Sequence, residues 1–308
     1  MSATAVVVED LHVAYGSTWA LDGIDLDVPR GSTLGVLGHN GAGKTTLIRV
    51  LTTLVRPNVG RVTVDGFDVV SDADRVRQRI GVTGQYAGLD EFLTGRENLE
   101  LVARLTGLGQ QARRRAGELI DRLDLHDVAA RRVGELSGGW RRRIDLAASL
   151  VGSPTVLFLD EPTTGLDPIG RAGLWDVVEE LTATGTTVVL TTQYLEEADR
   201  LADAIVVLDH GRVAARGTPA QLKGLVGGKV VTATIDHAAL DRLPRRPDGE
   251  RPASPGQVTV SFNADDAAAA MGVVADLAAA AVDLGDLDIA SPSLDDVFTH
   301  LTPIGARP

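Results

Sequence analysis

The stretch GHNGAGKT at residues 38–45 follows an apolar run, STLGVL at 32–37, and precedes a run with helical character, TLIRVL at 46–51. A G-x-x-x-x-G-K-[ST] pattern between a strand and a helix predicts a phosphate-binding loop. Glycines allow backbone conformations in which successive N–H groups point at one phosphate, and the positive N-terminal end of the helix adds to them. The alternative is a glycine-rich turn with an incidental lysine, and the flanking strand and helix argue against it.

In such a loop, Lys44 reaches the β- and γ-phosphates of a nucleotide and the hydroxyl of Thr45 binds Mg²⁺. We expect the whole loop and the residue after it to contact the nucleotide. These candidate binding residues are Gly38, His39, Asn40, Gly41, Ala42, Gly43, Lys44, Thr45 and Thr46.

Composition sets limits on the class of protein. The chain has 308 residues, enough for more than one domain, and is 44% hydrophobic and 23% charged, as is ordinary for a soluble globular protein. No stretch approaches the roughly 18 consecutive apolar residues of a membrane span, and we expect no signal peptide. Cysteine is absent, which excludes disulfides and thiolate metal sites. The net charge of −12 disfavours nucleic acid as a partner.

Strand-like and helix-like stretches alternate through the first two thirds of the chain, which predicts an α/β domain with a mainly parallel sheet. Short strands at 5–8, 11–15 and 24–28 come before the phosphate loop. Helical spacing without strands over about 88–135 predicts a helical insertion. Further strands are expected at 80–83, 155–159, 186–190 and 204–208.

The pattern changes after about residue 224. Strand-like runs at 230–235 and 258–262 flank a polar, proline-rich connector at 244–256, and two helices are expected near 264–281 and 293–301. We therefore predict two domains, residues 1–223 with the phosphate loop and residues 224–308 as a small α+β accessory domain. The six histidines show no metal-ligand spacing in the sequence.

A second chemical element is FLDE at residues 158–161, where a buried strand delivers two carboxylates to its carboxyl end. Ligands of open α/β sheets bind at that edge, where the phosphate loop also lies. Asp160 is placed to organise Mg²⁺ and Glu161 to polarise an attacking water. The alternative is a helix cap or a solvent-exposed pair.

Residues 136–139, LSGG, and the basic helix start WRRR at 140–143 resemble the signature motif of ABC-type ATPases. Four more features resemble motifs of this family and occur in the family's order. Tyr15 resembles the aromatic residue that stacks on adenine, and Gln85 resembles the Q-loop glutamine. GLD at 165–167 resembles the D-loop, and TTQYLEEAD at 191–199 resembles the switch region. The chain is identified by resemblance as an ABC transporter nucleotide-binding domain. Residues 140–150, 192–195 and 293–298 are similar to the daunorubicin-resistance type of drug exporter.

The resemblance implies a P-loop fold with a parallel-sheet core, an N-terminal antiparallel β subdomain and a helical insertion, followed by the small C-terminal domain. It implies ATP hydrolysis with Mg²⁺ as cofactor, and a homodimer in which two copies sandwich ATP. In that dimer Ser137, Gly138 and Gly139 of one copy bind the γ-phosphate held by Lys44 of the other. Without the resemblance, a lone tyrosine after a strand more often packs against the protein than stacks on a ligand.

The same resemblance implies that Gln85 contributes to the metal site and touches a membrane partner. Two permease subunits are expected, with this chain peripheral on the cytoplasmic face of the membrane. Two positions depart from the family pattern: Trp140 stands where glutamine is usual, and Gln193 where most members carry a γ-phosphate-contacting histidine. Glutamine has no charge to offer near neutral pH, so we expect slow to moderate turnover.

The function predicted is therefore the ATP-hydrolysing subunit of an exporter of a drug-like or amphipathic compound. One alternative is a soluble ABC ATPase of translation or DNA repair, but those carry two cassettes or a long coiled coil. Another is a regulator that binds nucleotide without hydrolysis, against which the presence of Lys44, Asp160 and Glu161 argues.

Overall fold

The computed structural model describes residues 3–84, 88–226, 228–280 and 284–301. It divides into two compact units between Ala214 and Ala215, and each is described by itself.

The first unit is built on a six-stranded sheet with the strand order β10-β9-β3-β8-β7-β6. The five strands from β9 to β6 run parallel, and the best-buried of them are nearly continuous apolar runs because both faces are covered. The strands are β3 (Thr33–Leu37), β6 (Ile80–Thr83), β7 (Val156–Asp160), β8 (Thr187–Thr192), β9 (Ala204–Asp209) and β10 (Arg212–Gly217). The predicted parallel core is confirmed.

An antiparallel sheet with the order β2-β1-β4-β5 lies over one face of this core. Its strands are β1 (Thr4–Tyr15), β2 (Thr18–Pro29), β4 (Val59–Val64) and β5 (Phe67–Asp68). The two separate strands predicted before residue 16 are one strand, β1, because the polar residues between them form an irregular register and not a break, with Asp10 at a φ of 48°. Helix α1 (Lys44–Leu51) buries its apolar side chains in the same core cluster as this sheet.

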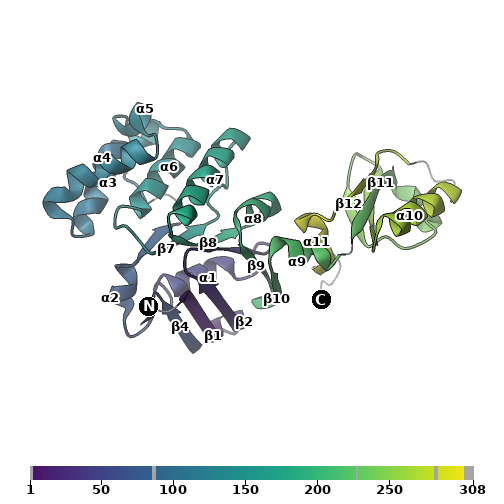
Figure 1. Ribbon diagram of the computed structural model, residues 1–308, viewed down its shortest axis with the longest axis horizontal. Coiled ribbons are helices and arrows are strands. Elements are labelled where there is room, and N and C mark those ends of the chain that lie inside the picture. Colours follow the sequence, from purple (N-terminus) through teal and green to yellow (C-terminus); the bar gives the residue numbers. More distant parts are fainter. Residues whose placement is uncertain (1–2, 85–87, 227, 281–283, 302–308) are drawn as a thin grey trace. The chain divides into compact units, whose positions relative to one another are not determined.

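Helices gather at the other side of the unit (Figure 1). They are α3 (Gly95–Leu105), α4 (Ala112–Arg122), α5 (His126–Ala129), α6 (Gly138–Ser149) and α7 (Pro168–Ala183). Thr94 and Glu97 form a capping box that begins α3. Arg115 of α4 donates to the carbonyls of Leu150 (2.8 Å) and Val151 (3.0 Å) just beyond α6, so the predicted helical insertion is tied to the core. Two short helices, α2 (Ala73–Arg77) and α8 (Leu195–Leu201), complete the unit.

The second unit has a four-stranded antiparallel sheet with the order β12-β13-β11-β14 and its own apolar core. Its elements are α9 (Pro219–Gly224), β11 (Lys229–Asp236), β12 (Gly249–Pro252), β13 (Gln257–Ala264), α10 (Ala267–Ala279), β14 (Leu287–Ala290) and α11 (Leu294–Leu301). The prediction that residues 244–256 form only a connector was wrong in part, because they contain β12, which pairs with β13. The sequence of β12, GERP, has no alternation of apolar and polar residues.

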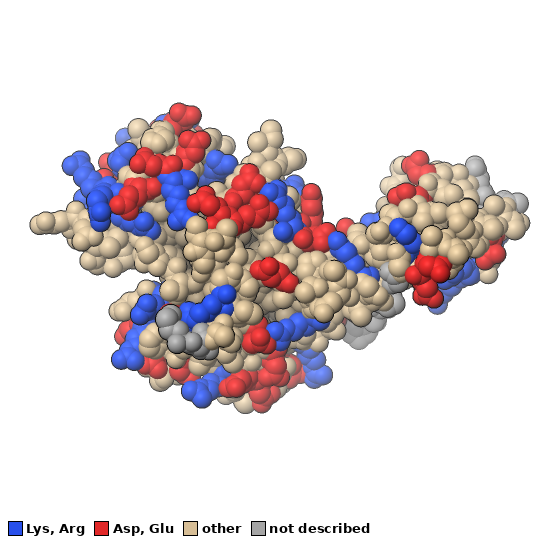
Figure 2. Space-filling model, viewed as in Figure 1, with Lys and Arg blue, Asp and Glu red and all other residues tan. Residues whose placement is uncertain are grey.

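Charged side chains of both signs are interspersed over the helices of the first unit, as Figure 2 shows for the face in view. Several are paired on the surface, for example Arg104 with Glu100 and Arg114 with Glu118. Among the described residues, no helix combines the length and the apolar character that a bilayer span requires.

Candidate functional site

The phosphate loop connects the carboxyl end of β3 to the first turn of α1. Gly41 and Gly43 have φ values of 86° and 108°, in the region that glycine alone adopts readily. A Cβ on Gly43 would also lie 2.7 Å from the carbonyl oxygen of Ala20. The glycine pattern of the sequence is therefore required by the backbone path of the loop and by its closest neighbour.

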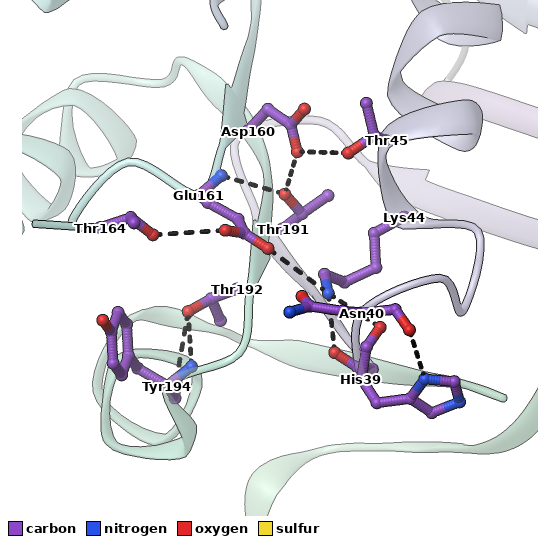
Figure 3. A network of polar contacts seen from close by, with 11 residues as sticks. His39, Asn40, Lys44, Thr45, Asp160, Glu161, Thr164, Thr191, Thr192 and Tyr194 are labelled. Carbon is purple, nitrogen blue, oxygen red and sulfur yellow. Dashed lines mark hydrogen bonds and ion pairs between the residues drawn. The ribbon is translucent and has the colours of Figure 1, made fainter. Parts of the chain in front are cut away.

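Lys44 begins α1, and only 4% of its side chain is exposed. Its Nζ donates to the carbonyl oxygens of Gly38 (2.7 Å) and His39 (3.2 Å) and lies 3.5 Å from Oε1 of Glu161. Figure 3 shows the amine between the loop and Glu161. A buried amine held in this way is not an incidental surface lysine.

Asp160 is the last residue of β7 and is buried. Its Oδ1 accepts a hydrogen bond from the hydroxyl of Thr191 on the neighbouring strand β8 (2.6 Å) and lies 3.5 Å from the hydroxyl of Thr45 (Figure 3). A hydroxyl and a carboxylate at one edge of the sheet are oxygen donors of the kind that Mg²⁺ prefers, so these residues fit that ion.

Glu161 follows Asp160 with a φ of 48°, a left-handed conformation that turns the chain away from the strand. Its N–H donates to the carbonyl and the hydroxyl of Thr191, both at 3.1 Å. Its carboxylate is 10% exposed, and besides facing Lys44 it accepts from the hydroxyl of Thr164 at 3.3 Å. The second carboxylate therefore faces back toward the phosphate loop and not outward into solvent.

A cavity of about 250 Å³ lies over this arrangement. Its lining residues are Ala20, His39, Asn40, Gly41, Gly43, Lys44, Thr45, Thr46 and Glu161. Most of the loop residues predicted to bind the nucleotide thus surround one hollow, with the second carboxylate on its wall.

The signature stretch lies elsewhere. Ser137 is the N-cap of α6, but its side chain makes no capping hydrogen bond, and both it and Gly138 are exposed. None of the three residues Ser137, Gly138 and Gly139 lines the cavity. Trp140 behind them is half-buried, with the guanidinium of Arg143 5.2 Å from the centre of its ring.

The sequence matches a family model described as ABC transporter over residues 21–164. A daunorubicin resistance ATP-binding protein of Streptomyces coeruleorubidus is 52% identical over 98% of this chain and 97% of its own length. The chain belongs to the ATP-binding proteins of ABC transporters. A daunorubicin/doxorubicin resistance ATP-binding protein of Streptomyces peucetius is 47% identical over 97% of this chain and 92% of its own length.

Among solved structures, a dimeric ATP-binding cassette in a post-hydrolysis state, bound to ADP and Pi, superimposes with a TM-score of 0.63. It is 26% identical and covers 69% of this chain and 98% of its own. The predicted family, its daunorubicin-resistance subtype and the fold are confirmed. The chain is an ABC transporter ATPase subunit, which couples ATP hydrolysis to transport.

Two more residues that the resemblance assigned, Gln193 and Tyr15, lie outside the central cluster. Gln193 is exposed in the bend between β8 and α8, and no hydrogen bond or ion pair in the described part of the chain joins it to Lys44 or Glu161. Tyr15 ends β1 and is half exposed, at the turn into β2, so packing does not account for its ring. Gln85 lies outside the described residues.

Sequence reasoning missed Arg142 of the ATPase subunit, a mostly buried residue on α6. Its guanidinium donates to the carbonyls of Asp160 (3.0 Å), Glu161 (3.3 Å) and Pro162 (2.8 Å), and to that of Gly84 (2.5 Å). One side chain thus holds the backbone of both carboxylate residues, Asp160 and Glu161. The run of three arginines after the signature was the available signal, but only the fold shows which of them points inward.

Asp145, one turn after Arg142 on α6, is also buried and was not predicted. Its carboxylate lies 3.5 Å from the guanidinium of Arg142 and accepts from the N–H of Gly88 at 3.2 Å. Burial raises the pKa of Asp145 to about 6, and the positive charge of Arg142 opposes part of that rise. Burial also lowers the pKa of Arg142.

Proposed function

We propose that this ATPase subunit powers the export of anthracycline-like drugs through a separate permease. Two relatives whose names specify daunorubicin or doxorubicin resistance support this, because they match the chain over nearly its full length. The substrate class is an amphipathic polycyclic amine. We propose residues 1–223 as the motor domain and residues 224–308 as the accessory domain.

The observation that carries the proposed chemistry is the convergence of Lys44, Asp160 and Glu161 at one edge of the parallel sheet. Lys44 and the loop N–H groups bind the β- and γ-phosphates of ATP. Thr45 and Asp160 hold Mg²⁺, which neutralises phosphate charge when bound. Glu161, fixed by Thr164 and by the Thr191 contacts of its N–H, orients the attacking water and accepts its proton.

The rest of the site comes from a second copy in this proposal. Ser137 and Gly138, which are exposed, and the half-buried Gly139 offer N–H groups and a hydroxyl to a phosphate at the start of α6. They bind the γ-phosphate of the ATP on the facing subunit, while Gln193 senses it and Tyr15 stacks on the adenine. The dimeric structure of a related cassette supports this arrangement.

The subunit works at the cytoplasmic face of the membrane in this proposal, attached to two permease subunits through a surface that includes Gln85. A hollow of about 1060 Å³, lined by residues of α2, β6, α3 and α6, supports the proposed attachment, since its lining includes Gly84 and Gly88, which flank residues 85–87 in the sequence.

The chemistry is tested by ATP hydrolysis of the subunit combined with its candidate permease, which is sought as a membrane protein encoded in a neighbouring reading frame. We expect Glu161→Gln to lower hydrolysis by about 10² to 10³ while ATP binding persists. Lys44→Ala weakens ATP binding itself. Glu196→Gln, which removes a charge from an exposed residue of α8, and Lys229→Ala in the second unit are the matched controls.

The substrate class needs a separate readout. Cells that produce both proteins should accumulate less doxorubicin than cells with the Glu161→Gln variant. Equal drug accumulation, with hydrolysis intact, would reject the anthracycline assignment and leave the ATPase assignment standing. Unimpaired hydrolysis in Glu161→Gln would reject the role of Glu161.

A further inference from the structure

Two histidines and an aspartate meet at the back of the phosphate loop. His39 is the second residue of the loop, Asp209 ends β9, and His210 lies in the turn that leads to β10. In the part of the chain that the structure describes, this is the one group of three such side chains whose ligand atoms all lie within 4.8 Å of one another. This group was not predictable from the sequence, because 170 residues separate His39 from Asp209.

Both ring nitrogens of His39 face oxygen atoms. Nδ1 lies 2.7 Å from the carbonyl oxygen of Asn40, and Nε2 lies 2.9 Å from Oδ1 of Asp209. A carbonyl oxygen only accepts, so Nδ1 carries the proton, and a neutral ring then presents a lone pair to the carboxylate. A metal ion on the Nε2 side can bind that lone pair and the carboxylate together. Figure 3 shows the ring directed away from Lys44 and its Nδ1 directed at Asn40.

A backbone carbonyl on one ring nitrogen is also what orients a metal-binding histidine, because it leaves the other nitrogen free to coordinate. His39 has this arrangement, and 38% of its side chain is exposed, so an ion can reach it. The carboxylate of Asp209 is 30% exposed on the same side.

His210 supplies the third ligand. Its Nε2 lies 3.8 Å from the same Oδ1 of Asp209, and the centres of the two imidazole rings are 5.3 Å apart. Two ligands about 2.1 Å from a tetrahedral Zn²⁺ lie roughly 3.4 Å from each other. The observed separations of 2.9 and 3.8 Å fall on either side of that value, so a small rotation of the exposed His210 ring suffices.

The backbone that carries these ligands is held together independently of them. The N–H of Gly211, next to His210, donates to the carbonyl oxygen of Ala42 in the phosphate loop at 3.1 Å. The carbonyl of Gly211 in turn accepts from Asp22 at 2.8 Å. The hairpin turn and the loop are thus already in position, and an ion does not have to order them.

The other histidine–carboxylate pairs of the described chain differ. His126 faces Asp121 at 3.3 Å without a third ligand. His12 lies between Asp10 and Asp22, but they contact opposite ring nitrogens, so one ion cannot bind all three. Only the His39 group presents its ligands toward a common point.

We propose that His39 Nε2, the Asp209 carboxylate and a ring nitrogen of His210 bind one Zn²⁺ ion or a similar divalent transition metal. Imidazole with a carboxylate suits such ions better than Mg²⁺. The bound ion ties the first half of the phosphate loop to the turn between β9 and β10. This places a metal-dependent restraint on the backbone that receives the nucleotide phosphates.

The test uses the full chain without a polyhistidine tag, free of nucleotide, with excess Mg²⁺ to occupy oxygen-only sites. Co²⁺ is added while its visible absorption is followed, and Zn²⁺ then displaces it. We expect one ion per chain, and an affinity at least about tenfold lower in His210→Asn and in Asp209→Asn. Asparagine is suitable at position 210 because it tolerates the φ of 46° found there.

His126→Asn is the matched control, because it removes an exposed imidazole that also faces a carboxylate. It should bind the ion as tightly as the unaltered chain. Thermal unfolding without metal checks that each variant is folded. Unchanged affinity in folded His210→Asn, or an equal loss in His126→Asn, overturns the proposal. ATP hydrolysis does not enter this test, so its outcome is independent of the proposed export function.

Discussion

The phosphate loop and the signature stretch are both rich in glycine, yet their surroundings differ. In the loop, a Cβ on Gly38 would lie 2.7 Å from the carbonyl oxygen of Leu208, and one on Gly43 equally close to that of Ala20. At the start of α6, a Cβ on Gly138 would meet nothing within 4 Å. The chain's own packing explains Gly38 and Gly43 of the loop but not Gly138.

The difference indicates where each half of the ATP site is completed. The loop, Lys44 and the two carboxylates already contact one another, so this half is assembled within one chain. Ser137 and Gly138 are exposed and make no contact with the loop among the described residues. The exposed backbone at Ser137 and Gly138 leaves room for a second molecule, in our proposal the ATP of a facing subunit.

Among the variants that test this comparison, Gly138→Asp should have the largest effect. An aspartate at the first position of α6 suits the helix and meets no neighbour, so we expect unfolding temperature and ATP binding by one chain to be unchanged. Its charge faces the γ-phosphate in the closed dimer, and hydrolysis should fall on the order of a hundredfold. Fluorescent-nucleotide binding and phosphate release measure the two quantities.

Gly117→Asp is the control, since Gly117 also has open space around its Cβ position but lies in α4, away from the proposed interface. It should hydrolyse ATP normally. Normal hydrolysis in Gly138→Asp would show that the space at Gly138 is not used, and the comparison between the two glycine motifs would lose its meaning.

Arg142 connects the two regions, because it lies on the helix that begins with the signature and binds the carbonyls after β7. We expect Arg142→Gln to lower hydrolysis about tenfold by shifting the backbone of Glu161. The KM for ATP should change less, because Lys44 and the loop do not contact Arg142. Arg143→Gln on the same helix is the control, since its guanidinium stacks on Trp140 instead.

A parallel fall in kcat and in ATP affinity in Arg142→Gln would mean general loss of structure and not displacement of Glu161. Circular dichroism and unfolding by urea give the corresponding check on the fold. Equal losses in both arginine variants would remove the specific link between the two regions.

These residues also show what the sequence could and could not predict. The loop and the two carboxylates were predictable because each follows an apolar strand, and parallel strands place their carboxyl ends at one edge. Arg142 was not, because its partners are backbone carbonyls, which leave no mark on the sequence. The contact between His39 and Asp209 was not predictable either, because the two residues meet only through the pairing of β3 with β9 in the sheet.

β12 was missed for a related reason. Its four residues contain no alternation of apolar and polar side chains, and it forms by pairing along β13 from Gly249↔Ser261 to Pro252↔Val258. A strand held by main-chain pairing at a sheet edge is invisible to a periodicity argument.

The smallest expected effect concerns Asp145, the buried partner of Arg142. Burial raises the pKa of Asp145 to about 6, above the value near 4 of an unfolded chain. As pH falls through 6, the folded state takes up a proton that the unfolded state does not yet bind, so this residue adds to the free energy of unfolding. The gain between pH 6 and pH 5 is about 1 kcal/mol, and it is absent above the folded pKa.

Urea unfolding of the full chain and of Asp145→Asn at several pH values isolates this contribution, since all other carboxylates cancel in the difference. The unaltered chain should gain stability relative to Asp145→Asn as pH falls from 7 to 5. Asp121→Asn, at an exposed carboxylate of α4, should show no such trend. If the difference does not vary with pH, Asp145 stays charged from pH 7 to pH 5 in the folded chain, as it does in the unfolded chain. The ion pair with Arg142 then outweighs the effect of burial, and both side chains contribute to the link between the two regions.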